Sequence, residues 1–163
     1  MSNLMIRPAT RADDDAVWAI LEPTIRAGET YALPRDGTRV QMLAYWFAAG
    51  NHVFVAEVGG DVLGTYALRA NQHGGGAHIA NAGFMTHPDA TGRGIARAMG
   101  VHAIETAASL GFLAMQFNFV VASNTRAVSL WKGLGFSEVG RLPGAFRHPV
   151  DGLVDALVMH RRL

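Results

Sequence analysis

"THPDATGRGIARAMG", residues 86–100, sets a glycine-rich turn directly in front of a helical pattern. A His-Pro-Asp turn leads into residues 91–94, and apolar residues then recur at helical spacing. The first turn of a helix has unpaired N–H donors and a partial positive charge, so glycines at this place favour the binding of an anion. The stretch therefore predicts a strand-to-helix junction that holds a negatively charged group.

Two common nucleotide motifs do not fit this loop. A dinucleotide fingerprint needs a third glycine where Arg97 stands and an acid at the end of the next strand, whereas Glu105 lies inside the helix. A Walker loop needs a Gly-Lys-Ser/Thr ending, which the chain lacks. Two interpretations stay open from the loop alone: a short loop around a pyrophosphate, or a tight turn in which glycines are common.

The side chains around the loop suit the pyrophosphate interpretation. Gly92 and Gly94 lack side chains that would block a diphosphate, and Ala96 keeps the next turn small. Arg93 and Arg97 add positive charge at the rim of the loop.

Hydrophobic periodicity on both sides of the loop predicts a mixed α/β domain of the α+β type. The expected order is β-α-α-β-β-β-α-β-α-β-β. A helical crossover separates the strands at 78–85 and 112–122, so we expect these two to pair in parallel, and the other pairs to be hairpins. The expected elements are strands at 5–8, 52–58, 62–70, 78–85, 112–122, 136–142 and 153–163, helices at 11–27, 39–49, 94–110 and 124–134, and a loop at 143–152.

The composition suits one domain over residues 1–163. Half of the residues are hydrophobic and 17% are charged, which predicts a substantial core. The net charge of +1 provides no basic field, so we expect no nucleic acid and no membrane as a partner. The low charge and the apolar segment 153–159 predict a homodimer.

The absence of cysteine excludes a disulfide, a thiolate nucleophile and a cysteine metal site. The histidines at 73, 78 and 87 do not have zinc spacing, so we expect no metal, and His78 is the one plausible histidine base. The sequence shows no signal-peptide-like run and no stretch near the roughly 18 apolar residues of a membrane span. These features predict a cytoplasmic protein.

A second motif follows about 30 residues after the glycine loop, NTRAVSLWKGLGF at 124–136. Together the two stretches resemble the GNAT superfamily of acetyl-CoA-dependent N-acetyltransferases. Its first motif, Gln/Arg-x-x-Gly-x-Gly/Ala, is similar to residues 91–96. Its second motif, Asn-x-x-Ala-x-x-Leu-Tyr-x-x-x-Gly-Phe, matches here at Asn124, Ala127, Leu130, Trp131, Gly135 and Phe136.

The resemblance implies that acetyl-CoA is the co-substrate and that its pyrophosphate is the anion of the loop. It also implies a mainly antiparallel sheet of six to seven strands with about four helices, whose central parallel pair splays apart to admit the thioester. The pantetheine arm would pair with the backbone of residues 84–86, and Asn124 would bind it. The implied cofactor-binding residues are Phe84, Met85, Thr86, Thr91, Gly92, Arg93, Gly94, Ile95, Ala96, Arg97, Asn124 and Trp131.

Two residues depart from the family pattern. Thr91 replaces the usual glutamine or arginine, so Arg93 would supply the missing phosphate contact. Trp131 replaces the tyrosine that often protonates the leaving thiolate, and an indole N–H is a poor proton donor. The resemblance therefore does not supply a general acid.

The acceptor chemistry is predicted around two asparagines in apolar strands. Asn81 and Asn118 lie one on each strand of the parallel pair, and a buried amide needs partners. Each is either a tie between strands or a group that orients the acceptor, and two together favour a catalytic and substrate-binding role. The candidate substrate-binding residues are Glu29, Tyr31, Arg35, Asn81, Asn118 and Phe119, with Arg35 suited to a carboxylate.

Asn81, Asn118 and Asn124, with the upstream stretch GETYALP, are similar to the proline-analogue (azetidine-2-carboxylate) acetyltransferase branch. This resemblance implies direct transfer of an acetyl group to the amine of a small molecule, an amino acid or an analogue. Two alternatives stay open: a protein or peptide N-acetyltransferase, and a CoA-binding regulatory module without catalysis.

Overall fold

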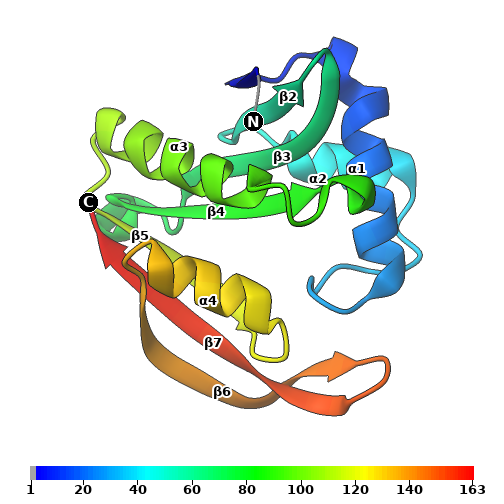
Figure 1. Cartoon of the computed structure of the whole chain (residues 1–163). Coiled ribbons are helices and arrows are strands. Elements are labelled where there is room, and N and C mark those ends of the chain that lie inside the picture. The colour runs from blue at the N-terminus through cyan, green and yellow to red at the C-terminus, as the bar shows by residue number, and fades with distance from the viewer. Residues whose placement is uncertain (1–2) are drawn as a thin grey trace.

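A seven-stranded mixed sheet forms the centre of the computed structural model, which describes residues 3–163 (Figure 1). The strands lie in the order β1-β2-β3-β4-β5-β7-β6, and only β4 and β5 are parallel neighbours within this sheet. The mixed α/β architecture and the order of elements expected from the sequence are confirmed. The strands are β1 Leu4–Pro8, β2 His52–Val58, β3 Asp61–Ala70, β4 Ile79–Thr86, β5 Ala114–Val121, β6 Ser137–His148 and β7 Gly152–Arg162.

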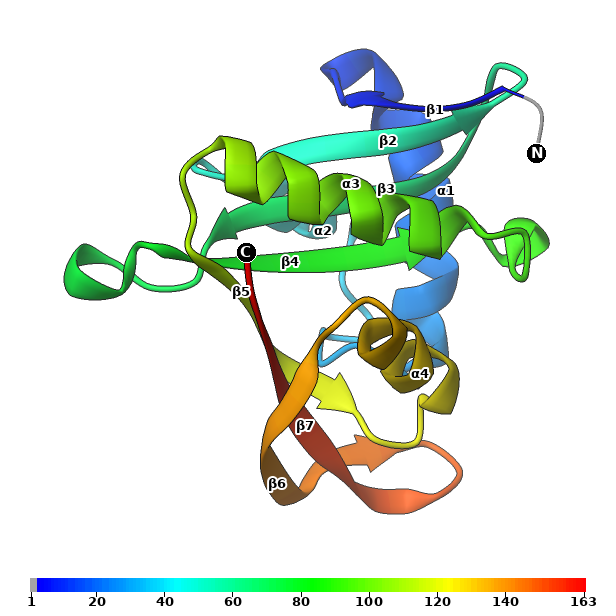
Figure 2. The same ribbon diagram turned by 60° about the vertical axis from the view of Figure 1, so that its left-hand side comes forward.

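Helices cover both faces of the sheet, with α3 and α4 on one face and α1 and α2 on the other (Figures 1 and 2). Their bounds are α1 Asp14–Ala27, α2 Arg39–Trp46, α3 Ile95–Ser109 and α4 Thr125–Gly133, with short 3-10 segments η1 Arg11–Asp13, η2 Gly74–Gly76 and η3 Pro88–Ala90. No helix within residues 3–163 is long and apolar enough to span a membrane.

The first helix begins at Asp14 after the 3-10 turn at 11–13, and two other segments differ more from the expectation. The second helix ends at Trp46 instead of residue 49, and the Asn51 amide donates a hydrogen bond to the Trp46 carbonyl there. The segment 143–152 is mostly strand: β6 runs on to His148, and a bulge takes Pro143, which has no N–H to donate, out of the hydrogen-bonded ladder. Asp155 on β7 also accepts a hydrogen bond from the Gly144 N–H, which holds β6 to its neighbour.

The parallel pair is very short. β4 and β5 share only the register pairs Ile79↔Ala114 and Ala80↔Met115. Beyond these pairs the two strands diverge toward their C-terminal ends, as Figure 2 shows. β5 stays attached to β7, and β4 stays attached to β3 along its whole length. The sheet therefore splits between β4 and β5, as the family resemblance implies.

Side chains of β3 and β4 point alternately to the two helical layers, because successive residues of a strand face opposite sides. Tyr66 and Leu68 belong to the core under α3 and α4, together with Ala82. Ala67 and Met85 belong to the core under α1 and α2. From Gly64 onward on β3, and along β4, the odd-numbered residues thus face α1 and α2, and the even-numbered ones face α3.

Gly64 on β3 sets how closely α3 approaches the sheet. A Cβ at this position would lie 2.9 Å from side-chain atoms of Ile95 and Met99, so a larger residue would have to displace these side chains. This contact lies near the start of α3 and positions the N-terminus of α3 beside the end of β4.

The apolar segment 153–159 lies inside the chain's own sheet. β7 sits between β5 and β6, and its residues Ala156, Leu157 and Met159 are buried, whereas Leu153 is exposed. The segment that motivated the homodimer thus mainly serves the core of one chain. The homodimer stays a prediction.

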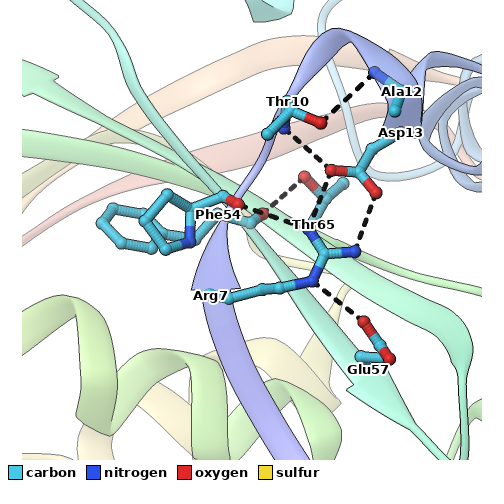
Figure 3. Close-up of polar contacts among 8 residues, drawn as sticks. Arg7, Thr10, Ala12, Asp13, Phe54, Glu57 and Thr65 are labelled. Carbon is cyan, nitrogen blue, oxygen red and sulfur yellow. Dashed lines mark hydrogen bonds and ion pairs between the residues drawn. The ribbon is translucent and has the colours of Figure 1, made fainter.

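Arg7 ties β1 to the start of the first helix (Figure 3). Its guanidinium donates two hydrogen bonds of 2.9 Å to the Asp13 carboxylate and a third, also 2.9 Å, to Glu57 on β2. Asp13 also accepts a hydrogen bond from the Thr10 N–H. These hydrogen bonds, chiefly those from Arg7, hold the pKa of the Asp13 carboxyl below its usual range.

Asp13→Asn is expected to lower the free energy of unfolding by about 1–3 kcal/mol at pH 7, because the ion pair of a largely buried carboxylate is lost. The lowered pKa means that the ion pair stabilises the fold fully above about pH 4, the ordinary pKa of the carboxyl, and loses this effect as pH falls through the lowered value. Urea unfolding at several pH values measures both effects.

Asp89→Asn is the matched control, since the Asp89 side chain is 92% exposed. It should leave stability nearly unchanged at pH 7. A difference between wild type and Asp13→Asn that stays the same from pH 7 to pH 2 would contradict the role given to the ion pair.

Candidate functional site

The glycine loop forms a cradle of backbone N–H groups at the N-terminus of α3. Gly92 and Gly94 have φ values of 81° and 78°, which a residue with a side chain rarely adopts. The first helical hydrogen bond runs from the Ala98 N–H to the Gly94 carbonyl. The three N–H groups before it, at residues 95–97, have no helical acceptor. They are therefore free to bind an anion.

The side chains of the cradle leave room for that anion. A Cβ built on Gly92 would meet no atom within 4 Å, and Arg93 and Arg97 are exposed at the rim. The Thr91 hydroxyl donates to the Pro88 carbonyl and is used within the loop. Ile95 is buried in the core, so only its backbone N–H faces the loop. An open cradle with two exposed cations fits a diphosphate.

A cleft of about 240 Å³ lies where β4 and β5 diverge. Its lining comes from both helical layers, so the cleft reaches through the split in the sheet. The lining residues are Thr30, Tyr31, Ala32, Leu33, Tyr45, Trp46, Arg69, Asn81, Ala82, Gly83, Phe84, Phe117, Asn118, Phe119, Val120, Val121, Asn124, Ala127 and Trp131. Among the residues implied by the sequence, Phe84, Asn124 and Trp131 meet Tyr31, Asn81, Asn118 and Phe119 here.

Aromatic rings form the wall on the α3 and α4 side. Trp131 is 7% exposed, and its ring centroid lies 4.8 Å from that of Phe84 and 4.7 Å from that of Phe117. Phe117 also stacks on Phe136 at 4.4 Å. Asn124 begins α4 by accepting a hydrogen bond from the Ala127 N–H, and it also lines the cleft. A thioester that reaches this wall would lie in an apolar environment.

Tyr31 connects the loop between α1 and α2 to β4. Its hydroxyl donates to the Phe84 carbonyl at 2.8 Å and accepts from the Phe84 N–H at 2.7 Å. Burial raises the pKa of Tyr31, so the hydroxyl stays protonated at neutral pH and cannot act as a base. Gly83 makes the approach possible, because a Cβ there would lie only 3.3 Å from the Tyr31 oxygen.

The two asparagines named from the sequence lie in different surroundings. Asn81 is 8% exposed, and its amide nitrogen donates to the Gln116 carbonyl at 3.0 Å, which bridges the split. Asn118 is exposed, donates to Asn71 at 2.6 Å and accepts from the Gln116 side chain at 3.0 Å. Asn81 therefore does tie the strands, while its oxygen has no hydrogen-bond partner within residues 3–163 and lies at the cleft.

Glu29 and Arg35 do not line the cleft and are both exposed. The Arg35 Nε donates to the Arg26 carbonyl, and the side chain packs over Gly28, so it serves the end of α1. The cleft instead contains Arg69 of β3, which sequence reasoning missed. The available signal was a single charged residue in the otherwise uncharged strand 62–70.

No Asp, Glu or His occurs among the residues that line the cleft. His78, the one histidine considered as a base, is not among them. The part of the chain that the structure describes also contains no group of three or more His, Cys, Asp or Glu side chains arranged to hold a metal ion.

The family model for the acetyltransferase (GNAT) family matches residues 16–136, most of the chain. This range includes both motifs and every residue that lines the cleft. The chain belongs to the GNAT family. The enzymes of this family are acyltransferases that use acetyl-CoA, and the cradle at residues 92–97 fits the diphosphate of that molecule.

Solved and curated relatives agree with this assignment. A GCN5-related N-acetyltransferase from Kribbella flavida is 41% identical, with TM-score 0.93 and 98% of each chain covered. The N-acetyltransferase aca1 of Schizosaccharomyces pombe is 33% identical over 98 residues, which cover 60% of this chain and 47% of that protein. The chain spans less than half of the length of the curated relatives that it matches.

The fold of yncA, a putative acetyltransferase from Salmonella typhimurium whose structure holds its cofactor acetyl-CoA, is also similar. It is 23% identical with TM-score 0.87, and the match covers 99% of this chain and 95% of that one. At this identity the likeness shows the fold alone.

Gly92→Asp is expected to weaken acetyl-CoA binding about tenfold or more, because it places a negative charge in the anion cradle. Gly111→Asp is the matched control: it also has a positive φ and open space around it, but lies at the other end of α3. Aspartate tolerates this backbone conformation better than most residues, so both variants should fold. Calorimetric titration with acetyl-CoA compares them, and equal losses of affinity would contradict the cradle.

Tyr31→Phe is expected to lower the free energy of unfolding by about 1–3 kcal/mol, because two backbone groups of Phe84 lose their partner. Tyr45→Phe is the control, since Tyr45 also lines the cleft but its hydroxyl forms no hydrogen bond within residues 3–163. It should change stability by less than about 0.5 kcal/mol. Urea unfolding measures both, and similar values for the two variants would refute the link to β4.

Proposed function

We propose that this chain transfers the acetyl group of acetyl-CoA to the amine of a small molecule, an amino acid or an analogue, by direct attack in a ternary complex. The observation that carries the proposal is the cleft through the split between β4 and β5. It joins the face of the sheet that holds the anion cradle to the face covered by α1 and α2. Two reactants can thus enter from opposite faces and meet in the sheet.

The cofactor would approach from the side of α3. With its pyrophosphate at residues 92–97, an extended arm would run along the open edge of β4 toward Phe84. The Phe84 N–H and carbonyl point to this edge, as their bonds to Tyr31 show, and residues two apart on a strand point the same way. Thr86 would therefore offer its backbone groups to the arm first.

The acceptor would approach from the side of α1 and α2. Asn81 and Gly83 face this layer, where Tyr31 and Trp46 cover β4. The unpartnered oxygen of Asn81 would accept a hydrogen bond from the amine and direct its lone pair toward the thioester carbon. Positioning of this kind removes a large part of the barrier of a two-substrate reaction.

Proton transfer would rely on solvent. The cleft lining contains no carboxylate or imidazole, and the Tyr31 hydroxyl is protonated. The amine must therefore attack in its neutral form and lose its proton to water after the carbon–nitrogen bond forms. The leaving thiolate would also take a proton from water, because the indole of Trp131 does not supply one.

An amino acid acceptor is supported by the amide groups at the cleft. Asn81 and Asn118 line the cleft, and Asn118 is held by the side-chain amides of Asn71 and Gln116, which do not line it. Such groups bind neutral amines and carboxylates without bringing a charge of their own. We propose that the acceptor is azetidine-2-carboxylate or a similar imino acid, as the resemblance to that branch implies.

A panel of amines assayed for CoA release tests this function. It contains proline analogues, methionine-derived amino acids, phosphinothricin-like amino acids and a short peptide. Release with the imino acids supports the proposal, and release with the peptide alone favours a protein N-acetyltransferase. Binding of acetyl-CoA with no release for any amine would leave a CoA-binding module and refute the proposal.

Asn118→Ala is expected to raise the KM for the amine and to leave acetyl-CoA binding intact, and Asn81→Ala is expected to lower kcat on the order of 10²-fold. Steady-state kinetics and melting temperatures are measured on the same variants. A purely structural role for both residues predicts a loss of about 1–3 kcal/mol in stability with nearly normal turnover. That result would move the acceptor site away from these asparagines.

A further inference from the structure

Arg69 is the one cation among the residues that line the cleft. It lies on β3 directly opposite Asn81 of β4. Residues opposite each other on antiparallel strands project to the same face, with Cβ atoms about 5 Å apart. The two side chains therefore lie side by side on the α1 and α2 face, where the acceptor would enter.

The Arg69 charge has no counter-ion among the residues that the structure describes. Within residues 3–163 it forms no ion pair with a carboxylate, although Arg7, Arg11, Arg26, Arg39 and Arg141 each do. None of the residues that line the cleft is acidic. Arg69 is also only partly exposed, so water does not fully screen its charge. A partly buried cation without a partner favours an anionic ligand.

The phosphates of acetyl-CoA are not that ligand. The anion cradle follows the end of β4 at Thr86, while Arg69 lies opposite Asn81 near the start of the strand. Five residues of strand separate the two, or about 17 Å at the usual rise per residue. Arg69 also faces the helical layer opposite to α3.

We propose that Arg69 binds the carboxylate of the acceptor and thereby selects amino acids and imino acids over simple amines. This inference rests on the proposed function. The guanidinium fork matches both oxygens of a carboxylate, and its neighbour Asn81 holds the amine. In an α-amino acid the carboxylate and the amine are attached to one carbon. This short separation agrees with the adjacent positions of Arg69 and Asn81 on paired strands.

The same charge also acts against the wrong acceptors. An amine without a carboxylate arrives as a cation and is repelled by Arg69, whereas an amino acid brings the charge that neutralises it. The aromatic walls at Tyr45, Trp46 and Phe119 suit a short hydrocarbon side chain or ring. The cleft thus favours a small apolar amino or imino acid.

The test compares three probes that differ only in the group next to the amine: L-azetidine-2-carboxylate, its carboxamide, and azetidine. The wild-type chain should prefer the carboxylate. Arg69→Gln should raise the KM for the carboxylate about 10- to 100-fold, the effect of losing one charge-assisted pair, with a much smaller change in kcat and for the other probes. Arg69→Lys should restore part of the affinity.

Arg147→Gln is the control, an exposed arginine on β6 that does not line the cleft. Calorimetric binding of the three probes in the presence of CoA gives a readout besides activity. Equal use of the three probes, or an unchanged KM in Arg69→Gln, overturns the role given to Arg69 and leaves the proposed reaction in place. If no probe is acetylated but the carboxylate binds through Arg69, the proposed reaction fails and this inference stands. If no probe binds or reacts, both fail.

Discussion

The short contact between β4 and β5 is the constraint on which the rest of the molecule depends. Two register pairs hold the strands together, and from there each follows a different partner, β4 with β3 and β5 with β7. A sheet that stayed closed would separate its two helical layers completely. Because it opens, a ligand anchored beside α3 can reach a ligand held under α1 and α2. The hydrogen bond from Asn81 to the Gln116 carbonyl crosses this opening near its origin.

The path of the chain could be predicted from the sequence because it depends on local patterns. The strand 78–85 and the helix after Gly94 follow from apolar spacing and turn residues within a few positions of each other. The errors are local too: β6 passes through Pro143 by means of a bulge, which no short-range pattern reveals. The candidate cofactor residues could be assigned for the same reason, since most of them occur in two continuous motifs.

The acceptor side depends on contacts between residues far apart in the chain. Tyr31 meets Phe84 across 53 positions, and nothing near either residue in the sequence indicates that they touch. Arg69 enters the cleft only through its register with Asn81, whereas Arg35, closer to Tyr31 in sequence, is held by a carbonyl of α1. Charge alone therefore did not identify the arginine of the cleft, and strand pairing was needed to find it.

The Tyr31 hydroxyl also affects what kind of chain can enter the sheet. An open split exposes a strand edge in the middle of the molecule, and unpaired N–H and carbonyl groups on such an edge attract other polypeptide strands. At Phe84 both backbone groups are occupied by the Tyr31 hydroxyl, and Trp131 packs against the Phe84 ring. A foreign strand would have to displace the Tyr31 hydroxyl and Trp131 before it could pair with β4 further in than Thr86. A narrow flexible arm needs only the backbone groups near Thr86. The protein thus keeps an internal edge open without offering a template for aggregation.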